Sequence, residues 1–130
     1  MKSILIVDDS TVIRCYLRRL LEAQPGWIIC GEAENGCDAI DRAKELRPDL
    51  IVTDLAMPML NGIVATSVLK QIMPAVPIVM FTSFSDPSIK KTAMAAGLDA
   101  FVGKSESPET LLSCIEQLLV PKPLRSDSAA

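Results

Sequence analysis

The sequence predicts an α/β fold in which a central parallel sheet is covered by helices on both faces. Short runs rich in Val, Ile and Leu alternate with longer stretches of helical period, which is the pattern of repeated βα units. The apolar runs are continuous rather than alternating, as in strands buried on both faces. The 130 residues suffice for one domain with five such units, fewer than a closed (β/α)8 barrel needs. We therefore expect a doubly wound, three-layer sandwich.

The strands are predicted from the apolar runs and the helices from the segments between and after them. The strands are expected at 3–8, 27–32, 49–54, 77–82 and 100–103, and the helices at 11–23, 36–46, 62–73, 87–96 and 108–120. Ser10 and Asn61 can cap the first and third helices. Asp86 and Ser107, each followed by proline, can cap the fourth and fifth. Because βαβ crossovers are right-handed, the helices should lie on both sides of the sheet.

The first helix divides clearly into a polar and an apolar face. Its expected polar face carries Arg14, Arg18 and Arg19. Its expected apolar face consists of Val12, Ile13, Tyr16, Leu17, Leu20 and Leu21. We expect this apolar face to pack on the sheet.

Charge and hydropathy indicate a protein that binds neither nucleic acid nor membranes. The net charge is −3 and no block of like charges is present. The apolar runs, such as residues 4–7, are too short to cross a bilayer or to form the core of a secretion signal. We expect a cytoplasmic protein with one domain at 1–120 and a flexible tail or linker stub at 121–130.

The cysteines and the absence of histidine exclude several kinds of site. The chain has four cysteines in no CxxC pair and no histidine, so the usual Cys/His zinc spacings are excluded. We expect reduced, mostly buried thiols. Without histidine, Ser-His-Asp and Cys-His catalysis are excluded, and the chain is itself no phosphohistidine carrier. Acid or base chemistry must come from carboxylates or lysine.

Polar residues of one chemical set stand at four strand ends. Asp8 and Asp9 follow the first strand, Asp54 ends the third, Thr82 ends the fourth and Lys104 follows the fifth. The carboxyl ends of parallel strands converge where an open sheet changes its winding direction, so these residues can share one pocket. Three crowded carboxylates repel one another, and oxygen ligands of this kind suit Mg²⁺ or Mn²⁺. The sequence therefore predicts a divalent metal site.

The same pocket has the groups that an aspartyl phosphate needs. Lys104 can pair with one phosphate oxygen and the Thr82 hydroxyl can hydrogen-bond another. Because the protein's part in phosphoryl transfer is mainly positioning and charge neutralisation, such a site works without histidine. Asp54 is the predicted nucleophile, because it stands alone at its strand end. Taken singly, each residue has a simpler structural interpretation, and Glu32 at the end of the second strand is interpreted as surface charge.

Over about residues 3–120 the chain resembles the receiver domains of two-component response regulators, the CheY-like group. The matching motifs are LIVDDS at 5–10, DLAMPMLNG at 54–62, FTS at 81–83 and FVGK at 101–104, in that family's order and spacing. The resemblance implies a flavodoxin-like fold with strand order 2-1-3-4-5, and it makes residues 1–120 a receiver domain. It also implies that a sensor histidine kinase or phosphotransfer protein gives its phosphoryl group to Asp54. No turnover of a separate substrate is expected, only uptake and loss of the chain's own phosphoryl group.

The resemblance assigns further roles to residues around Asp54. It implies that Asp9, Asp54 and the backbone carbonyl of Ala56 hold Mg²⁺ or Mn²⁺, with Asp8 acting through water. Thr82 and Phe101 match the family's switch pair, in which the hydroxyl moves toward the phosphate and the ring turns inward. This movement changes a partner-binding or dimerisation surface on the fourth helix, fifth strand and fifth helix.

Some positions near the site depart from the family's pattern or vary within it. Ser105 follows Lys104 where the family usually has proline after a cis bond. A cis bond before serine costs about 2.5–4 kcal/mol, so we expect a trans bond and a differently shaped loop. Ala56, Ser83 and Phe84 flank the site, and the apolar Ala56 and Phe84 are expected to limit the access of water and prolong the phosphorylated state.

The output and some rival functions stay open. The segment DAFVGKSESPETLLSCI at 99–115 resembles receivers joined to the DNA-binding modules of NarL/FixJ-type regulators, but no such module follows residue 120. The chain is then either a protein read by an unknown partner, with a phosphorylation-dependent homodimer as one form, or the excised receiver of a transcription regulator. A small Mg²⁺-dependent phosphatase needs a second acid where Ala56 stands. In a flavodoxin-like electron carrier Asp8 and Asp9 would repel the cofactor phosphate. Intact Asp54, Thr82 and Lys104 argue against a pseudo-receiver that serves only as an interaction module.

Overall fold

The structure, a computed structural model, describes residues 1–84 and 86–120, and the predicted tail at 121–130 lies outside the described residues. Strands and helices alternate along the chain as predicted. They are β1 (Lys2–Val7), α1 (Thr11–Glu22), β2 (Trp27–Ala33), α2 (Gly36–Leu46), β3 (Leu50–Thr53), α3 (Gly62–Ile72), β4 (Ile78–Thr82), α4 (Pro87–Ala95), β5 (Ala100–Gly103) and α5 (Pro108–Leu119).

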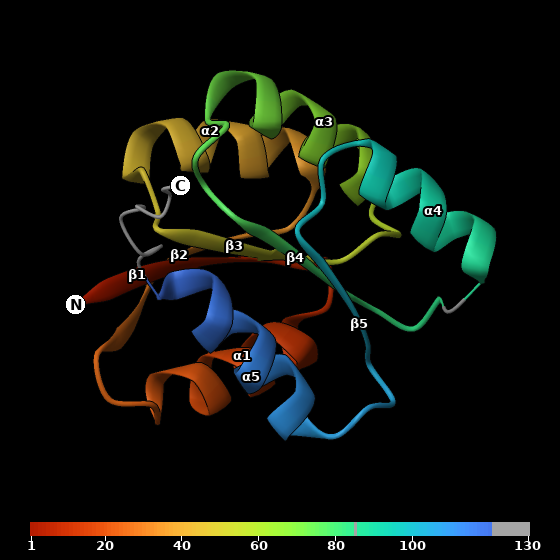
Figure 1. Ribbon diagram of the computed structural model, residues 1–130. Helices are drawn as coiled ribbons and strands as arrows, with labels where there is room; N and C mark the ends of the chain where they lie inside the picture. The colour runs from red at the N-terminus through yellow and green to blue at the C-terminus, as the bar shows by residue number, and fades with distance from the viewer. Residues whose placement is uncertain (85, 121–130) are drawn as a thin grey trace, which may run out of the picture.

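The five strands form one parallel sheet in the order β2-β1-β3-β4-β5, which confirms the predicted topology. Helices α1 and α5 cover one face of this sheet, and α2, α3 and α4 cover the other (Figure 1). The chain changes its winding direction between β1 and β3, which are hydrogen-bonded neighbours. The carboxyl ends of these two strands therefore lie side by side where such folds place their ligand sites.

The core consists of two apolar clusters, one on each side of the sheet. Successive strand residues point to opposite faces, so Ile4 and Ile6 belong to the cluster under α1 and α5, and Leu5 and Val7 to the cluster under α2, α3 and α4. All four side chains are almost completely buried. Burial on both faces explains why the strands read as continuous apolar runs.

Helix α1 packs on the sheet through most of its predicted apolar face, but the prediction is wrong at Val12, Tyr16 and Arg14. Val12 and Tyr16 are 76% and 41% exposed, whereas Leu17 and Leu21 are buried. The Arg14 side chain, predicted to be exposed, is only 12% exposed because it lies three residues before Leu17 and therefore on the buried stripe. Its charge is accommodated there by an ion pair and a backbone carbonyl.

Three of the four predicted helix caps are confirmed. The side chains of Ser10, Asn61 and Asp86 accept backbone hydrogen bonds at the starts of α1, α3 and α4. Ser107 precedes α5 but makes no side-chain cap bond, and its hydroxyl lies 3.3 Å from that of Thr110 instead. Asn35 caps α2 and was not predicted.

The cysteines are less buried than predicted. All four are free thiols, as expected, but Cys15 and Cys37 are exposed and Cys30 and Cys114 only half-buried. None of the helices in the described part of the chain is long and apolar enough to cross a membrane.

Candidate functional site

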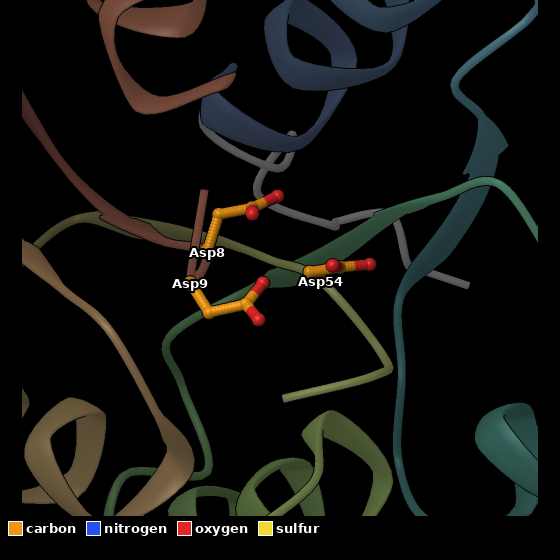
Figure 2. Close-up of side chains that lie close together, drawn as sticks. All are labelled: Asp8, Asp9 and Asp54. Carbon is orange, nitrogen blue, oxygen red and sulfur yellow. The ribbon is translucent and has the colours of Figure 1, made fainter. Parts of the chain in front are cut away.

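Three carboxylates meet at the carboxyl ends of β1 and β3. Asp8 and Asp9 follow β1 directly, and Asp54 follows β3. The Asp54 amide donates to the Val7 carbonyl at 2.9 Å, which joins the two strand ends. The three side chains are drawn in Figure 2, and each contributes an oxygen within 4.8 Å of the other two. The predicted convergence of Asp8, Asp9 and Asp54 is therefore present.

Lys104 connects two of these carboxylates. Its ammonium Nζ lies 3.0 Å from Asp8 Oδ2 and 3.3 Å from Asp54 Oδ2. The second oxygen of each of these carboxylates accepts a backbone hydrogen bond. Asp8 Oδ1 accepts one from the Ser10 amide at 2.9 Å, and Asp54 Oδ1 accepts one from the Leu55 amide at 2.8 Å. Asp8 and Asp54 are buried, whereas Asp9 is exposed. The ammonium therefore pairs with the two buried carboxylates, and Asp9 is the member of the cluster that is open to solvent.

The electrostatics of the site favour a protonated lysine and a basic Asp54. Burial, followed by the negative charge of Asp8, raises the pKa of Asp54 above its ordinary value, although Lys104 and the Leu55 amide oppose the rise. Burial acts to lower the pKa of Lys104, but its hydrogen bond to Asp8 and the charge of Asp54 outweigh it, so the pKa is raised. Lys104 is therefore a permanent cation, and Asp54 carries a more basic carboxylate than a free aspartate.

The loop from β5 to α5 places Lys104 without a proline. The Lys104–Ser105 peptide bond is trans, as predicted for a serine at that position. The Lys104 amide donates to the Thr82 carbonyl at 2.8 Å. The Glu106 carboxylate accepts the Gly103 amide at 2.7 Å, and the Glu106 amide donates back to the Gly103 carbonyl at 3.0 Å. A side-chain hydrogen bond thus fixes the turn after Lys104.

Thr82 and Phe101 lie on the neighbouring strands β4 and β5. Thr82 is fully buried at the end of β4, and its Oγ1 accepts the Phe84 amide at 3.2 Å. Phe101 pairs in register with Met80 and packs against the cluster under α2, α3 and α4. The flanking residues Ala56, Ser83 and Phe84 are all exposed, Phe84 to 45%.

The loop from β3 to α3 passes very close to Asp54. The Gly62 amide donates to the Leu55 carbonyl at 2.8 Å, and a Cβ on Gly62 would overlap the Asp54 carbonyl oxygen. Only glycine fits this approach, so Gly62 lets α3 begin against the strand end that carries Asp54. Within the same loop Met59 has a φ of 69°, in the left-handed region.

The contacts of two residues near the site, Glu32 and Arg14, were not predicted from the sequence. Glu32 is not simply a solvated surface charge, because it forms ion pairs with Arg14 at 2.9 Å and Arg18 at 2.8 Å. Arg14 also donates to the Asp8 carbonyl at 2.6 Å. The available signal was helical spacing, since Arg14 lies three residues before the buried Leu17 and seven before the buried Leu21.

The donor set suits a divalent cation. One ammonium neutralises only one of three clustered carboxylates, and carboxylate oxygens are the ligands that Mg²⁺ and similar ions prefer. Asp8, Asp9 and Asp54 therefore form an acidic cluster that can bind a metal ion. The Lys104 ammonium beside Asp54 also offers positive charge to an anionic group attached to that carboxylate.

Comparison with known proteins gives one family. The family model described as the response regulator receiver domain matches residues 4–116. The chemotaxis protein CheY of Halobacterium salinarum is 37% identical over 118 residues, 91% of this chain and 97% of that protein. The transcriptional regulatory protein LnrK of Bacillus subtilis is 31% identical over 115 residues, 88% of this chain and 52% of LnrK. A crystal structure of a LuxR-family two-component response regulator from Aurantimonas sp. SI85-9A1 has a TM-score of 0.88 at 34% identity, covering 92% of this chain and 85% of that one.

Proposed function

Because the chain belongs to the response regulator receiver domain family, we propose that it takes up a phosphoryl group on Asp54 and thereby changes a protein-binding surface. The observation that carries the proposal is the position of Lys104 Nζ, 3.3 Å from Asp54 Oδ2, in a cluster whose third carboxylate, Asp9, is exposed. A phosphoryl group on Asp54 would then lie near both a lysine ammonium and a further carboxylate that can bind a metal ion.

The reaction is a displacement at phosphorus. An Asp54 carboxylate oxygen forms the new O–P bond as the N–P bond of a donor phosphohistidine breaks, and the electron pair of that bond remains on the imidazole. The donor is a sensor histidine kinase or a phosphotransfer protein. The raised pKa of Asp54 makes its carboxylate a better nucleophile, while Lys104 neutralises charge on the transferred group.

A divalent cation, Mg²⁺ or Mn²⁺, is the proposed cofactor. Asp9, Asp54 and the Ala56 carbonyl would hold it, with Asp8 acting through water. Its positive charge, when it is bound, offsets the charge on the phosphoryl oxygens. The protein's own residues hold Asp54 in place and leave Asp9 open to solvent, the side from which a donor can approach.

The proposed output is a change around α4, β5 and α5. Thr82 is fully buried at the end of β4, and among the described residues its hydroxyl accepts one long hydrogen bond, from the Phe84 amide at 3.2 Å. This hydroxyl can turn to a phosphoryl oxygen, and Phe101 on the adjacent strand then repacks. We propose that proteins read this surface, a separate partner or an output domain of a longer chain, because the net charge of −3 does not favour DNA.

The direct test is the intact mass of the protein after incubation with Mg²⁺ and acetyl phosphate. We expect one phosphoryl adduct on the parent chain and none on Asp54→Ala or in an EDTA control. Asp41→Ala, an exposed position on α2, is the matched control and should be phosphorylated like the parent. An adduct that persists in Asp54→Ala would contradict the assignment of the site, and no adduct on the parent would contradict the function.

The lifetime of the adduct tests the flanking residues. Phe84 is an exposed apolar residue two positions after Thr82, and we propose that it limits the approach of water to the site. Phe84→Glu should then shorten the half-life of the phosphorylated protein after the donor is removed, measured by mass. A half-life equal to that of the parent would show that Phe84 does not protect the phosphoryl group.

A further inference from the structure

A nearly buried arginine, Arg14, binds the backbone carbonyl of Asp8 in the acidic cluster. Asp8 lies one residue beyond β1, so its carbonyl has no partner in the strand ladder. A buried carbonyl needs a donor, and Arg14 supplies it from α1, with Nη1 at 2.6 Å from the Asp8 oxygen. The Arg14 side chain is only 12% exposed.

Glu32 in turn fixes the arginine. Its Oε1 accepts Arg14 Nε at 2.9 Å and its Oε2 accepts Arg18 Nε at 2.8 Å. Partial burial acts to raise the pKa of Glu32, but the hydrogen bonds from Arg18 and Arg14 outweigh it and the pKa is lowered. Glu32 is therefore ionised at neutral pH and holds the guanidinium in one orientation. Arg18 shares Glu32 but has no contact with Asp8 among the hydrogen bonds of the described residues.

The held carbonyl belongs to the peptide bond that links Asp8 to Asp9. A fixed peptide plane limits the directions in which the Asp9 side chain can leave the backbone, and Asp9 is the exposed member of the cluster. We propose that Arg14, oriented by Glu32, is a positioning residue of the metal site, so that it strengthens divalent cation binding without touching the cation. This inference rests on the proposed function, because it requires that the cluster binds a divalent cation.

Simple electrostatics predicts the opposite effect. A guanidinium close to a cation site repels the cation, so removal of its charge alone should tighten binding. Removal of a residue that orients ligands from the surrounding shell typically weakens metal binding by 10-fold or more, which we expect to be the larger effect here, roughly 10-fold. The direction of the change therefore separates positioning from charge.

The experiment is a titration of the unphosphorylated full chain with Mn²⁺, in which free Mn²⁺ is measured by its electron paramagnetic resonance signal. Arg14→Met should weaken binding about 10-fold relative to the parent. Arg18→Met is the matched control, because it removes a charge and a Glu32 partner but no contact to Asp8, and its affinity should be unchanged or slightly tighter. Arg14→Lys keeps the charge but not the fork that reaches both Glu32 and Asp8, so it should also bind more weakly than Arg18→Met.

The role of Glu32 is tested by a double-mutant cycle. Glu32→Gln should weaken Mn²⁺ binding in the parent, but in the Arg14→Met background it should have little further effect, because Glu32 acts through Arg14. Thermal unfolding of each metal-free variant controls for general damage to the fold. If Arg14→Met fails to fold, Arg14→Lys and Glu32→Gln carry the same test.

Two kinds of failure are distinguishable. If Arg14→Met binds Mn²⁺ as tightly as the parent or more tightly, and Asp9→Asn does not bind it, the positioning role would be overturned. The proposed metal site would remain. The same holds if metal-free stability falls but affinity does not, since Arg14 would then be purely structural. No Mn²⁺ binding by the parent, or binding unaffected by Asp9→Asn, would overturn the metal site and the inference together.

Discussion

At the scale of single residues, Lys104 reduces the repulsion within the acidic cluster but does not neutralise its whole charge. Its ammonium pairs with two buried carboxylates, yet the pKa of Asp54 still lies above its ordinary value because burial and Asp8 outweigh that pairing. The folded protein therefore binds a proton at Asp54 more tightly than the unfolded chain does. This contribution to stability is fully present below the unfolded pKa of about 4 and is lost as the pH rises through the folded pKa.

The first prediction concerns Asp54→Asn. At pH 7 without divalent cations, the neutral side chain removes a desolvated charge and its repulsion from Asp8, so the free energy of unfolding should rise by on the order of 1 kcal/mol. Near pH 3 the parent carboxyl is protonated and the difference should disappear. Urea unfolding at both pH values, in EDTA, measures this.

Magnesium provides the control for that prediction. In excess Mg²⁺ the parent should gain stability by binding the cation and the advantage of Asp54→Asn should shrink or reverse. A variant that is less stable than the parent at pH 7 in EDTA would show that the ion pair with Lys104 outweighs the burial cost of the charge.

The second prediction concerns the backbone at Met59. This residue has a left-handed φ of 69° and an 80% exposed side chain, so the conformation is strained and little packing offsets the strain. Met59→Gly should raise the free energy of unfolding by up to about 1 kcal/mol, the released strain less the added entropy of the unfolded glycine. Met59→Ala keeps a Cβ and should gain nothing. An equal gain in both variants, measured by denaturant unfolding, would place the cause in the methionine side chain.

At the scale of elements, the start of α3 and the end of β3 form one unit through Gly62. The missing Cβ allows the helix to begin against the Asp54 carbonyl, so the position of the helix and that of the carboxylate depend on each other. A change that moves one must move the other, because both partners in the contact are backbone.

The third prediction follows from this contact. Gly62→Ala should lower the free energy of unfolding by about 3 kcal/mol and should also weaken divalent cation binding, because the strand end must shift. Gly31→Ala is the matched control, since its Cβ would overlap the end of the Leu46 side chain, which can rotate, and make an ordinary contact with Leu5, so its cost should be about 1 kcal/mol or less. Unfolding in urea and Mn²⁺ titration measure the two effects. A loss of stability without a change in affinity would mean that the loop absorbs the strain.

The helices and strands could be predicted because their signals are local, whereas the strand order followed from the resemblance to receiver domains. Apolar runs, capping residues and prolines act within a few residues, and all five strands and helices were found from them. The predicted exposure of α1 side chains was wrong at Val12, Tyr16 and Arg14. The helix has more apolar residues than one buried stripe can hold, and which of them are buried depends on tertiary partners. The ion pair with Glu32 joins α1 to β2 and leaves no local trace in the sequence.

The candidate site was also predicted only in part from the sequence. Asp8, Asp9, Asp54 and Lys104 could be brought together by reasoning, because the strand ends of a parallel sheet converge at its winding reversal. The turn after Lys104 could be predicted only as far as its trans bond. That Glu106 closes this turn on the Gly103 amide depends on the rotamer of one side chain, which the residue pattern does not reveal.

At the scale of the whole molecule, the sheet lies between the two apolar clusters, and its strands contribute side chains to both of them. Alternate residues of the same strands contribute to each cluster, so damage to one side of the sheet is shared by the other. We therefore expect a single cooperative unfolding transition.

The fourth prediction tests this cooperativity. Leu69 is buried in the cluster under α2, α3 and α4, and Trp27 packs against the opposite cluster. Leu69→Ala should lower the free energy of unfolding by about 2–5 kcal/mol, and Trp27 fluorescence and far-ultraviolet circular dichroism should report the same shift in midpoint. If the Trp27 transition stayed at the parent midpoint while circular dichroism shifted, the two faces would unfold separately.

The ion pair between Asp8 and Lys104 joins residues 96 positions apart, and this separation affects the chain during its own synthesis. At 5–20 residues per second, a ribosome adds the 50 residues from Asp54 to Lys104 in roughly 3–10 s. During this interval the carboxylates of Asp8, Asp9 and Asp54 are already in the nascent chain, and the ammonium that pairs with two of them is not. Dissolved cations can then supply counter-charge to these carboxylates, and the acidic cluster gains its ammonium only when the last strand docks.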